Sequence, residues 1–488
     1  MTVEPRADNE RMGRALAGLP LASGRPWRAA SILMVITAFV LGGVIAADLF
    51  PTSRGAWDQD IYHLRVVQQF ASQWPTPDVG DYRSGSTPLY HLSLAAVSRW
   101  LSDDPRMLRA AGALYTLAMV GLAAWVCAGR VGAWRGFALA LPLAASPYVF
   151  ASGAWILPDN AGWLWLLVVM VIAWRVPLTG ASLAVAGLAL VLLVLTRQVH
   201  LWAASQLWLA ALLPIAAPGV DPRAPMAWEL SSRRVRLLGA AILASVPAFL
   251  AVAWFVHRWH GLVPPMFQGG AFDDVINEPF PRNSGGNPSV LTVILALAGI
   301  IGTFFVGFAW PTVQRLIRLD RALWMRVITW GLVGGVLAAL PVSTYNQDAG
   351  RFTGVWDIAR RTPVVAGRSL FLVAAAAWGA AIIGLWFSAL SRRDRWMFLG
   401  AWAGFIAAQM PSMQAWQRYY EPFILLVFML AAVQAACSAD AAAAIRAMHA
   451  APEPDADAVV RPAVPRWAAA GPVALALLLA AVTVIRLK

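Results

Sequence analysis

A short polar segment, residues 57–63, holds two carboxylates and an imidazole, those of Asp58, Asp60 and His63. A carboxylate at the edge of a low-dielectric region is a stronger base, because desolvation disfavours its charged form, and it can then accept a proton from a hydroxyl group. On a helix that begins near Asp58, Asp60 lies on the same side as His63, so we expect Asp60 to be the catalytic base and His63 to be a catalytic residue beside it. Asp58 remains an alternative base, or the N-cap of that helix. Trp57 is expected to contact the bound ligand.

A third carboxylate, Asp159, stands at the start of a later apolar run, directly after Pro158. Pro and Asp before an apolar run are a helix-start signal. An acidic residue at membrane depth is also a candidate for function, particularly where it faces a water-filled cavity. Two interpretations therefore stand for Asp159: a helix start alone, or a helix start that also contacts a substrate.

A polar interruption at residues 197–200 separates two apolar runs and contains Arg197, Gln198 and His200. The guanidinium group is a fork of donors that matches phosphate oxygens. A tight turn here would bring Arg197 and His200 to the surface together, where a lipid phosphate is a natural ligand. The alternative is that Arg197 only snorkels and marks the membrane boundary.

Two further segments combine arginines with aromatic residues: one contains Arg351 and Arg361, the other Arg418 and Tyr419. Each alone could be a belt of membrane anchors. Together they favour an anionic, lipid-linked ligand, with Arg197, His200, Arg351, Arg361 and Arg418 expected near its phosphate, and Asp159, Gln198, Tyr419 and Trp57 expected near the rest of the substrate.

The composition defines the elements that must position these residues. Of 488 residues, 59% are hydrophobic and 13% are charged, and the mean hydropathy is +0.63. A soluble protein is effectively excluded, because ordinary globular domains are about 25% charged. The formal charge of +13 is spread over short segments, so nucleic acid is not expected as a partner. Cys127 and Cys437 lie within apolar runs, which leaves no disulfide framework and no thiolate metal site.

Apolar runs of spanning length predict an all-α, polytopic bundle of about thirteen transmembrane helices. The first run is long enough to span and lacks a convincing cleavage site, so we expect no cleavable signal peptide. The arginines of the short loops favour a cytoplasmic N-terminus, and the preference for Arg over Lys is typical of a bacterial genome, which places the chain in the bacterial inner membrane. The expected spans are 29–49, 108–128, 134–150, 159–175, 179–195, 200–217, 236–256, 289–310, 326–342, 369–389, 396–411, 419–438 and 467–486.

Within this topology the expected parts are a cytoplasmic tail (1–28), a catalytic membrane domain (29–438), a flexible cytoplasmic segment (439–466) and a last span (467–488). The long outer segments are 50–107, 257–288 and 343–368. Helical spacing of apolar residues in the first outer segment predicts two interfacial helices with a turn between them. The candidate residues gather in these outer segments, so we expect an extracytoplasmic active site.

The order of these motifs resembles the GT-C class of membrane glycosyltransferases, and within it the eukaryotic dolichyl-phosphoglucose-dependent alpha-1,2-glucosyltransferases. The pieces that match are short and collinear over most of the chain. They are the segments 60–63, 87–90, 197–198 with Trp202, 259–268, 351–353 with 360–361, and 418–419, together with Asp159.

The resemblance implies a fold, a reaction and roles for residues. It implies an enzyme that uses a polyprenyl-phosphate-linked sugar as donor, with inversion at the outer face. We expect a glycan or lipid-linked acceptor, and no cofactor or metal ion, because a lipid phosphate is a good leaving group once its charge is paired. The resemblance places Asp60 at the acidic position of the first loop, and Arg197, Arg351 and Arg418 near the donor phosphate. The relatives have an acidic residue where this chain has Gln59, while this chain has its other acid at Asp58. Either carboxylate therefore remains open as the base.

Three other functions were weighed against this one. A transporter or flippase of a lipid-linked sugar usually has ionisable groups near the bilayer midplane and internal repeats, whereas the midspan residues here are nearly all apolar and we find no repeat. A polysaccharide polymerase or ligase of related architecture is a second alternative. A non-catalytic scaffold would leave the carboxylates and arginines without a role.

Overall fold

The computed structural model describes residues 25–213, 231–268, 272–273, 278–279, 285–450 and 463–487. The described residues are almost entirely helical, which confirms the predicted all-α class. Most of the predicted N-terminal tail lies outside them, as does 451–462. Within the predicted flexible segment 439–466, the helix that begins at Glu421 continues to Ala450, and the flexibility of the segment stays a prediction.

Each predicted apolar run coincides with a helix or a pair of helices. These are α2 (Pro26–Ala46), α6 (Pro105–Val131), α7 (Ala133–Ala145), α8 (Pro147–Ala154), α9 (Asp159–Arg175), α10 (Gly180–Thr196), α11 (Ala204–Leu212), α12 (Ser232–Trp259), α13 (Ser289–Gly302), α14 (Trp310–Ile317), α15 (Arg321–Ala339), α17 (Leu370–Ala389), α18 (Arg392–Gln409), α19 (Glu421–Ala450) and α20 (Ala470–Leu487).

The count of thirteen spans is not confirmed. Among the described residues, eight helices are long and apolar enough to cross a membrane, or nine if α7 and α8, bent by 68°, form one broken span. Helices α9 and α10 have 17 residues each. An apolar run predicts burial away from water but does not fix whether the helix is covered by lipid or by protein. Helix α9, for example, is buried over most of its length.

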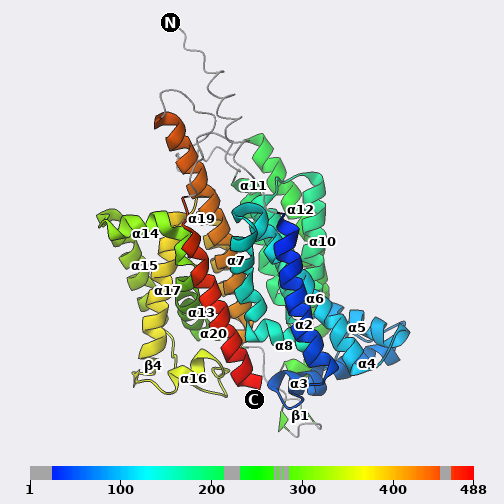
Figure 1. Ribbon diagram of the computed structural model, residues 1–488. Helices are drawn as coiled ribbons and strands as arrows, with labels where there is room; N and C mark the ends of the chain where they lie inside the picture. The colour runs from blue at the N-terminus through cyan, green and yellow to red at the C-terminus, as the bar shows by residue number, and fades with distance from the viewer. Residues whose placement is uncertain are drawn as a thin grey trace.

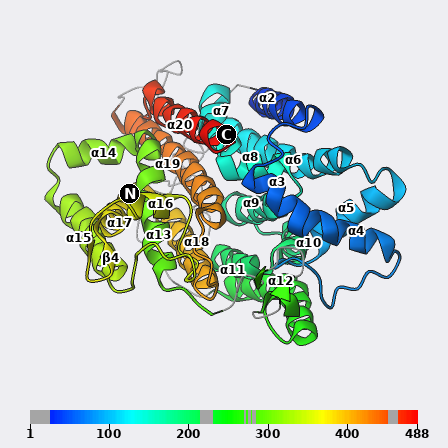
Figure 2. The ribbon, with the colours of Figure 1, turned by 90° about the horizontal axis from the view of Figure 1, so that it is seen from below.

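Helix α19 lies at the centre of the bundle. It packs against both α6 and α13, and its residues from Phe423 to Val433 are almost completely buried. In the view of Figure 2, α13, α15 and α17 gather on one side of α19, and α2, α6 and α9 on the other. The residues before α19 are therefore held where the two groups of helices meet.

Small residues allow the helices on one side to approach closely. A Cβ atom added at Gly379 of α17 would lie 1.8 Å from the carbonyl oxygen of Leu295 in α13. One added at Gly334 of α15 would lie 2.1 Å from the Cβ of Ala380. Close backbone contact at glycine is typical of helix packing in membranes, where packing and not the hydrophobic effect drives association.

The shorter elements collect at one end of the bundle, which we call the loop end (Figure 1). They are α3 (Arg54–Asp58), a π-helical turn (Gln59–His63), α4 (Leu64–Ser72), α5 (Leu89–Trp100), α16 (Val355–Ala359) and the two-residue strands β1 (Phe272–Asp273), β2 (Glu278–Pro279), β3 (Val364–Val365) and β4 (Arg368–Ser369). Short 3-10 helices span Gln198–Ala203, Pro265–Phe267, Thr303–Ala309, Gln417–Tyr419 and Arg466–Ala469.

The described parts of the three predicted outer segments thus share the loop end, while α14 lies at the opposite end (Figure 1). Direct hydrogen bonds join the first two segments, because the indole of Trp259 donates to the carbonyl of Val79 over 2.9 Å. Helices α4 and α5 occupy the places predicted for the two interfacial helices and pack together. The side of the membrane that the loop end faces stays a prediction.

Candidate functional site

A cavity of about 830 Å³ lies at the loop end. It is bounded by the first loop, the 3-10 helix Gln198–Ala203, α11, α12 and the segment between α18 and α19. Aromatic rings form much of its wall, and the arginine, carboxylate and imidazole side chains in it are those of Arg54, Asp58, His63, Arg83, Arg197, His200, Asp348 and Arg418. The first loop and the start of α19, far apart in sequence, therefore meet at one cavity.

Asp58 and Arg418 form an ion pair in the wall of this cavity. The Asp58 carboxylate is largely buried, and the guanidinium of Arg418 also lies over the rings of Trp416 and Tyr419, 5.1 and 5.0 Å from their centroids. Arg54 approaches the second carboxylate oxygen at 3.8 Å. The carboxylate is thus held in place by cations while it remains next to the cavity.

The N-cap interpretation of Asp58 is wrong. Helix α3 begins at Arg54, and its cap is Ser53, whose hydroxyl oxygen accepts a hydrogen bond from the backbone N–H of Ala56. Asp58 is the last residue of α3 and caps nothing with its side chain. Its carboxylate is therefore free of a helix-capping role.

The local geometry places Asp58, and not Asp60, beside the cavity, so the role of Asp60 as base stays a prediction without a geometric observation behind it. The turn Gln59–His63 is π-helical, with the N–H of Leu64 donating to the carbonyl of Gln59 five residues earlier. A π turn places residues five apart on one face, where α-helical geometry would separate them. Asp58 and His63 therefore both line the cavity, whereas Asp60 is exposed and accepts a hydrogen bond from the side-chain amide of Gln59.

Gln59 stands at the position where the glucosyltransferases that the sequence resembles carry an acid. It has a structural role that was not predicted from the sequence. Its buried side-chain oxygen accepts hydrogen bonds from Arg109 Nε at 2.9 Å and from the backbone N–H of Ile156 at 3.2 Å. Arg109 is paired at 2.6 Å with Asp48. This network ties the π turn to α6 and to the segment before α9. The feature of the sequence that could have indicated this network is Arg109, an arginine near the start of an apolar run.

His63 is joined to His91 of α5, a residue that the sequence analysis did not select. Nδ1 of His63 and Nε2 of His91 are 2.9 Å apart, and the two rings are stacked. Burial lowers the pKa of His63 well below its ordinary value, and the proximity of His91, Arg418 and Arg197 lowers it further. Burial and Arg197 lower the pKa of His91 to about 3. Both imidazoles are neutral at physiological pH.

Asp159 is the first residue of α9, as predicted, and it forms a 2.6 Å ion pair with Arg197. Arg197 also lies over the ring of Tyr419, 5.1 Å from its centroid. Asp159 and Arg197 were predicted separately and the structure brings them together, with Arg197 in the wall of this cavity and Asp159 in the wall of a smaller one. Arg197 is therefore held between a carboxylate and an aromatic ring.

Gln198 and His200 contribute to the wall in different ways. The Gln198 amide donates to the carbonyls of Gly85 and Leu262, both at 2.9 Å, and so joins two loops. His200 lines the cavity but is 2% exposed, packed against Trp163 with ring centroids 4.7 Å apart. The expectation that His200 lies at the surface is wrong, because the turn is a 3-10 helix that directs this ring inward.

Arg351 and Arg361 do not line the cavity. Arg351 donates from Nε to the carbonyl of Thr344 and pairs through its backbone with Asn346, so its role is to shape the loop. Arg361 is exposed beyond α16. The same loop contributes Asp348 and Phe352 to the cavity. The expectation that Arg351 and Arg361 face a donor phosphate therefore has no support in the geometry.

A second cavity, of about 160 Å³, lies on another side of the Asp58 and Arg418 pair. Its remaining wall is mostly apolar, with Tyr148, Phe150, Trp155 and Leu487. Asp58 and Arg418 line both cavities. The carboxylate thus stands where two molecules could approach it from different sides.

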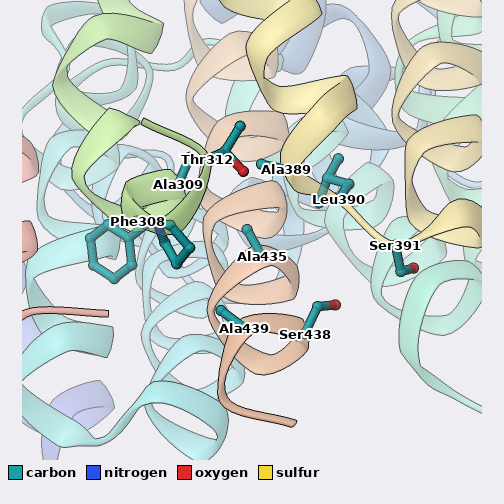
Figure 3. Close-up of a pocket in the computed structure, with 10 residues that line it drawn as sticks. Phe308, Ala309, Thr312, Ala389, Leu390, Ser391, Ala435, Ser438 and Ala439 are labelled. Atoms are coloured by element: carbon teal, nitrogen blue, oxygen red, sulfur yellow. The ribbon is translucent and has the colours of Figure 1, made fainter. Parts of the chain in front are cut away.

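Two other kinds of site, a second location for a small ligand and a metal site, have little support in the described residues. A cavity of about 20 Å³ near α14, lined by residues such as Phe308, Thr312 and Ser391, has no charged side chain and has room for about one water molecule (Figure 3). No group of three or more His, Cys, Asp or Glu side chains within the described ranges could hold a metal ion. Metal independence stays a prediction.

Comparisons with known proteins leave the family open. No model of a protein family matches the chain, and no curated protein matches it. The chain is similar to the crystal structure of ArnT from Cupriavidus metallidurans in the apo state, with 14% identity over 83% of this chain and 77% of that chain, and a TM-score of 0.31. At this identity and TM-score, the similarity supports no conclusion about the function of this chain. The class that the helices themselves define is an all-helical, polytopic membrane protein.

Proposed function

We propose that the chain is a GT-C-type glycosyltransferase of the bacterial inner membrane, with its N-terminus in the cytoplasm. It transfers a sugar, with inversion, from a polyprenyl-phosphate-linked donor to a glycan or lipid-linked acceptor at the extracytoplasmic face. The observation that carries the proposal is the position of Asp58, a largely buried carboxylate shared by two cavities and paired with Arg418.

In the proposed reaction Asp58 takes the proton from the acceptor hydroxyl. The hydroxyl oxygen attacks the anomeric carbon from the face opposite the lipid phosphate, and the bond from that carbon to the phosphate oxygen breaks with its electron pair. Arg418 and Arg197 compensate the charge of the departing polyprenyl phosphate. Donor phosphate would draw Arg418 away from Asp58, which then becomes the stronger base because it loses its cationic partner.

The walls of the large cavity fit such a donor. Aromatic rings suit the apolar faces of a sugar and of a prenyl chain. Trp208 of α11 and Phe249 of α12 line the cavity and stack on each other, and Phe249 is 40% exposed. The side of the cavity formed by α11 and α12 offers a route for the prenyl chain to reach the lipid.

The transporter alternative has less support. Ionisable groups on a transport pathway are expected near the middle of the bilayer. The cavity's carboxylates and arginines lie at the loop end of the helices, beside the first loop and the segment before α19. This arrangement favours a reaction at one face over passage across the membrane.

The experiment compares Asp58→Asn with Asp60→Asn in the same lipid environment. Asn keeps the size of the side chain but cannot accept the proton, so Asp58→Asn should reduce the transfer rate by about 10²-fold or more. Asp60→Asn should transfer sugar close to the wild-type rate, because Asp60 is exposed and outside both cavities. Transfer of a radiolabelled sugar from polyprenyl phosphate and donor affinity are measured for both variants.

The two variants serve as controls for each other. An Asp60→Asn protein more impaired than Asp58→Asn would return the role of base to Asp60. Wild-type turnover in both variants would remove the base from this loop. Loss of donor binding in Asp58→Asn, with no separate effect on turnover, would make Asp58 a binding residue.

A further inference from the structure

The hydrogen bond between His63 and His91 constrains which nitrogen atoms carry protons. It joins Nδ1 of His63 to Nε2 of His91. Two nitrogen atoms lie outside this bond. Nε2 of His63 remains to face the cavity that this ring lines, and Nδ1 of His91 is buried without a partner in the described part of the chain. A neutral imidazole has one donor nitrogen and one acceptor nitrogen.

Two proton arrangements satisfy the bond. In the first, His63 donates from Nδ1, and His91 then carries its own proton on Nδ1, as a buried N–H with no acceptor. In the second, His91 donates from Nε2, so its Nδ1 is a bare lone pair and the proton of His63 lies on Nε2. Buried N–H groups without an acceptor are rarer in proteins than under-used acceptors, which favours the second arrangement.

A doubly protonated ring is disfavoured by the surroundings of the pair. Arg418 and Arg197 lower the pKa of His63, and Arg197 lowers that of His91. The rings of Tyr82 and Tyr90 also pack against His91 and add no negative charge. The pair therefore holds two N–H protons, one of them shared within the pair.

We infer that His63 presents a fixed Nε2–H donor to the large cavity and that His91 is the positioning residue that holds this tautomer. A fixed donor recognises an oxygen lone pair of the bound molecule, either a sugar hydroxyl or a phosphate oxygen. His63 is then a binding group and not an acid or base, in contrast to the role expected from the sequence. Only the identity of the ligand rests on the proposed function.

The direct test is the tautomer itself. Nitrogen NMR of the full chain, labelled with ¹⁵N-histidine and reconstituted in lipid nanodiscs, distinguishes Nε2–H from Nδ1–H imidazoles. His63→Gln and His91→Gln variants assign the two signals among the six histidines. We expect Nε2–H in both rings at pH 7. An Nδ1–H signal from either ring, or an imidazolium, overturns the inference, whatever the activity of the protein.

Side-chain replacement tests the consequence for binding. Gln places an N–H donor close to the position of Nε2, whereas Phe keeps the ring and removes the donor. His63→Phe should therefore weaken donor binding by about 10- to 100-fold, and His63→Gln should recover most of it. His91→Phe should weaken binding less than His63→Phe, because His63 keeps a proton on Nε2 but loses the hydrogen bond that orients its ring. His257→Phe, at an exposed histidine outside this cavity, is the matched control.

Two ligands separate the possible acceptors. Polyprenyl phosphate alone and the sugar-bearing donor are each titrated against the wild type and His63→Phe. A loss for both assigns the contact to phosphate, and a loss for the sugar-bearing donor alone assigns it to the sugar. Equal failure of His63→Gln and His63→Phe, with melting temperatures near that of the wild type, refutes the donor role. If the tautomer is correct but no sugar is transferred, the proposed function fails and the inference about the pair does not.

Discussion

Replacing Arg197 tests whether its position reflects ligand binding or only helix packing. Arg197→Ala removes a guanidinium that lines the cavity and is paired with Asp159 at 2.6 Å. A hydrogen bond to a charged group contributes about 1.5–3 kcal/mol, so affinity for polyprenyl phosphate should fall roughly 10- to 150-fold. Arg197→Lys should recover only part of this, since the planar fork is lost.

The same substitution has a second effect that must be separated from the first. The side chains of Arg197 and Asp159 are 16% and 9% exposed, and removal of one partner from a buried pair typically destabilises a protein by about 3–5 kcal/mol. The double variant Arg197→Ala/Asp159→Asn removes the charge that would be left unpaired. It should melt at a higher temperature than Arg197→Ala but bind phosphate no better.

The assay is a titration of polyprenyl phosphate in nanodiscs, with melting temperatures measured on the same samples. Arg361→Ala is the matched control, because this arginine is exposed and outside the cavity. Wild-type affinity in Arg197→Ala, or recovery of affinity in the double variant, would refute the reasoning: Arg197 would then serve only to compensate Asp159.

Two further predictions concern stability and topology. Burial lowers the pKa of His63 and brings that of His91 to about 3, so the unfolded chain binds protons that the folded chain does not. The free energy of unfolding should therefore fall as the pH is lowered from 6.5 toward 3, by up to about 1.4 kcal/mol per pH unit for each imidazole. If the melting temperature changes between pH 7.5 and 5 by the same amount in the wild type and in a His63→Gln/His91→Gln variant, the prediction is contradicted. Topology can be tested in a chain in which Cys127 and Cys437 are replaced by Ala. A cysteine introduced at the exposed Thr76 should react with a membrane-impermeant thiol reagent in whole cells, and one introduced at the exposed Arg318 should not. The reverse pattern would place the loop end in the cytoplasm.

The helices could be predicted from the sequence, and the reason is physical. A long apolar run must leave water, and a backbone that leaves water must form its own hydrogen bonds, so each run became a helix. The number of spans could not be predicted in the same way, because α9 and α10 have only 17 residues each and α9 is buried among other helices over most of its length. Hydrophobicity does not distinguish a protein environment from lipid.

The candidate site was predicted in part. Arg197, Asp159, Arg418 and Tyr419 were selected because polar residues are unfavourable beside apolar runs unless they have partners, and the structure brings them together. His91 was missed because the residue that it is hydrogen-bonded to is another histidine, 28 residues away in sequence. Partners from different helices leave no mark in local spacing.

The π-helical turn takes up one residue more than an α-helical turn would. An α-helix brings residues four apart onto one face, whereas this turn does so for residues five apart. Deletion of one residue from 59–63 that restores α-helical winding would therefore leave the buried face of α4, with Val66, Val67 and Phe70, close to its present partners. It would instead remove one of the side-chain positions of the turn, which carries both the cavity-lining His63 and the Gln59 that binds Arg109. A single-residue gap here, in any alignment with other chains, would mark the same arrangement of helices around a differently built site.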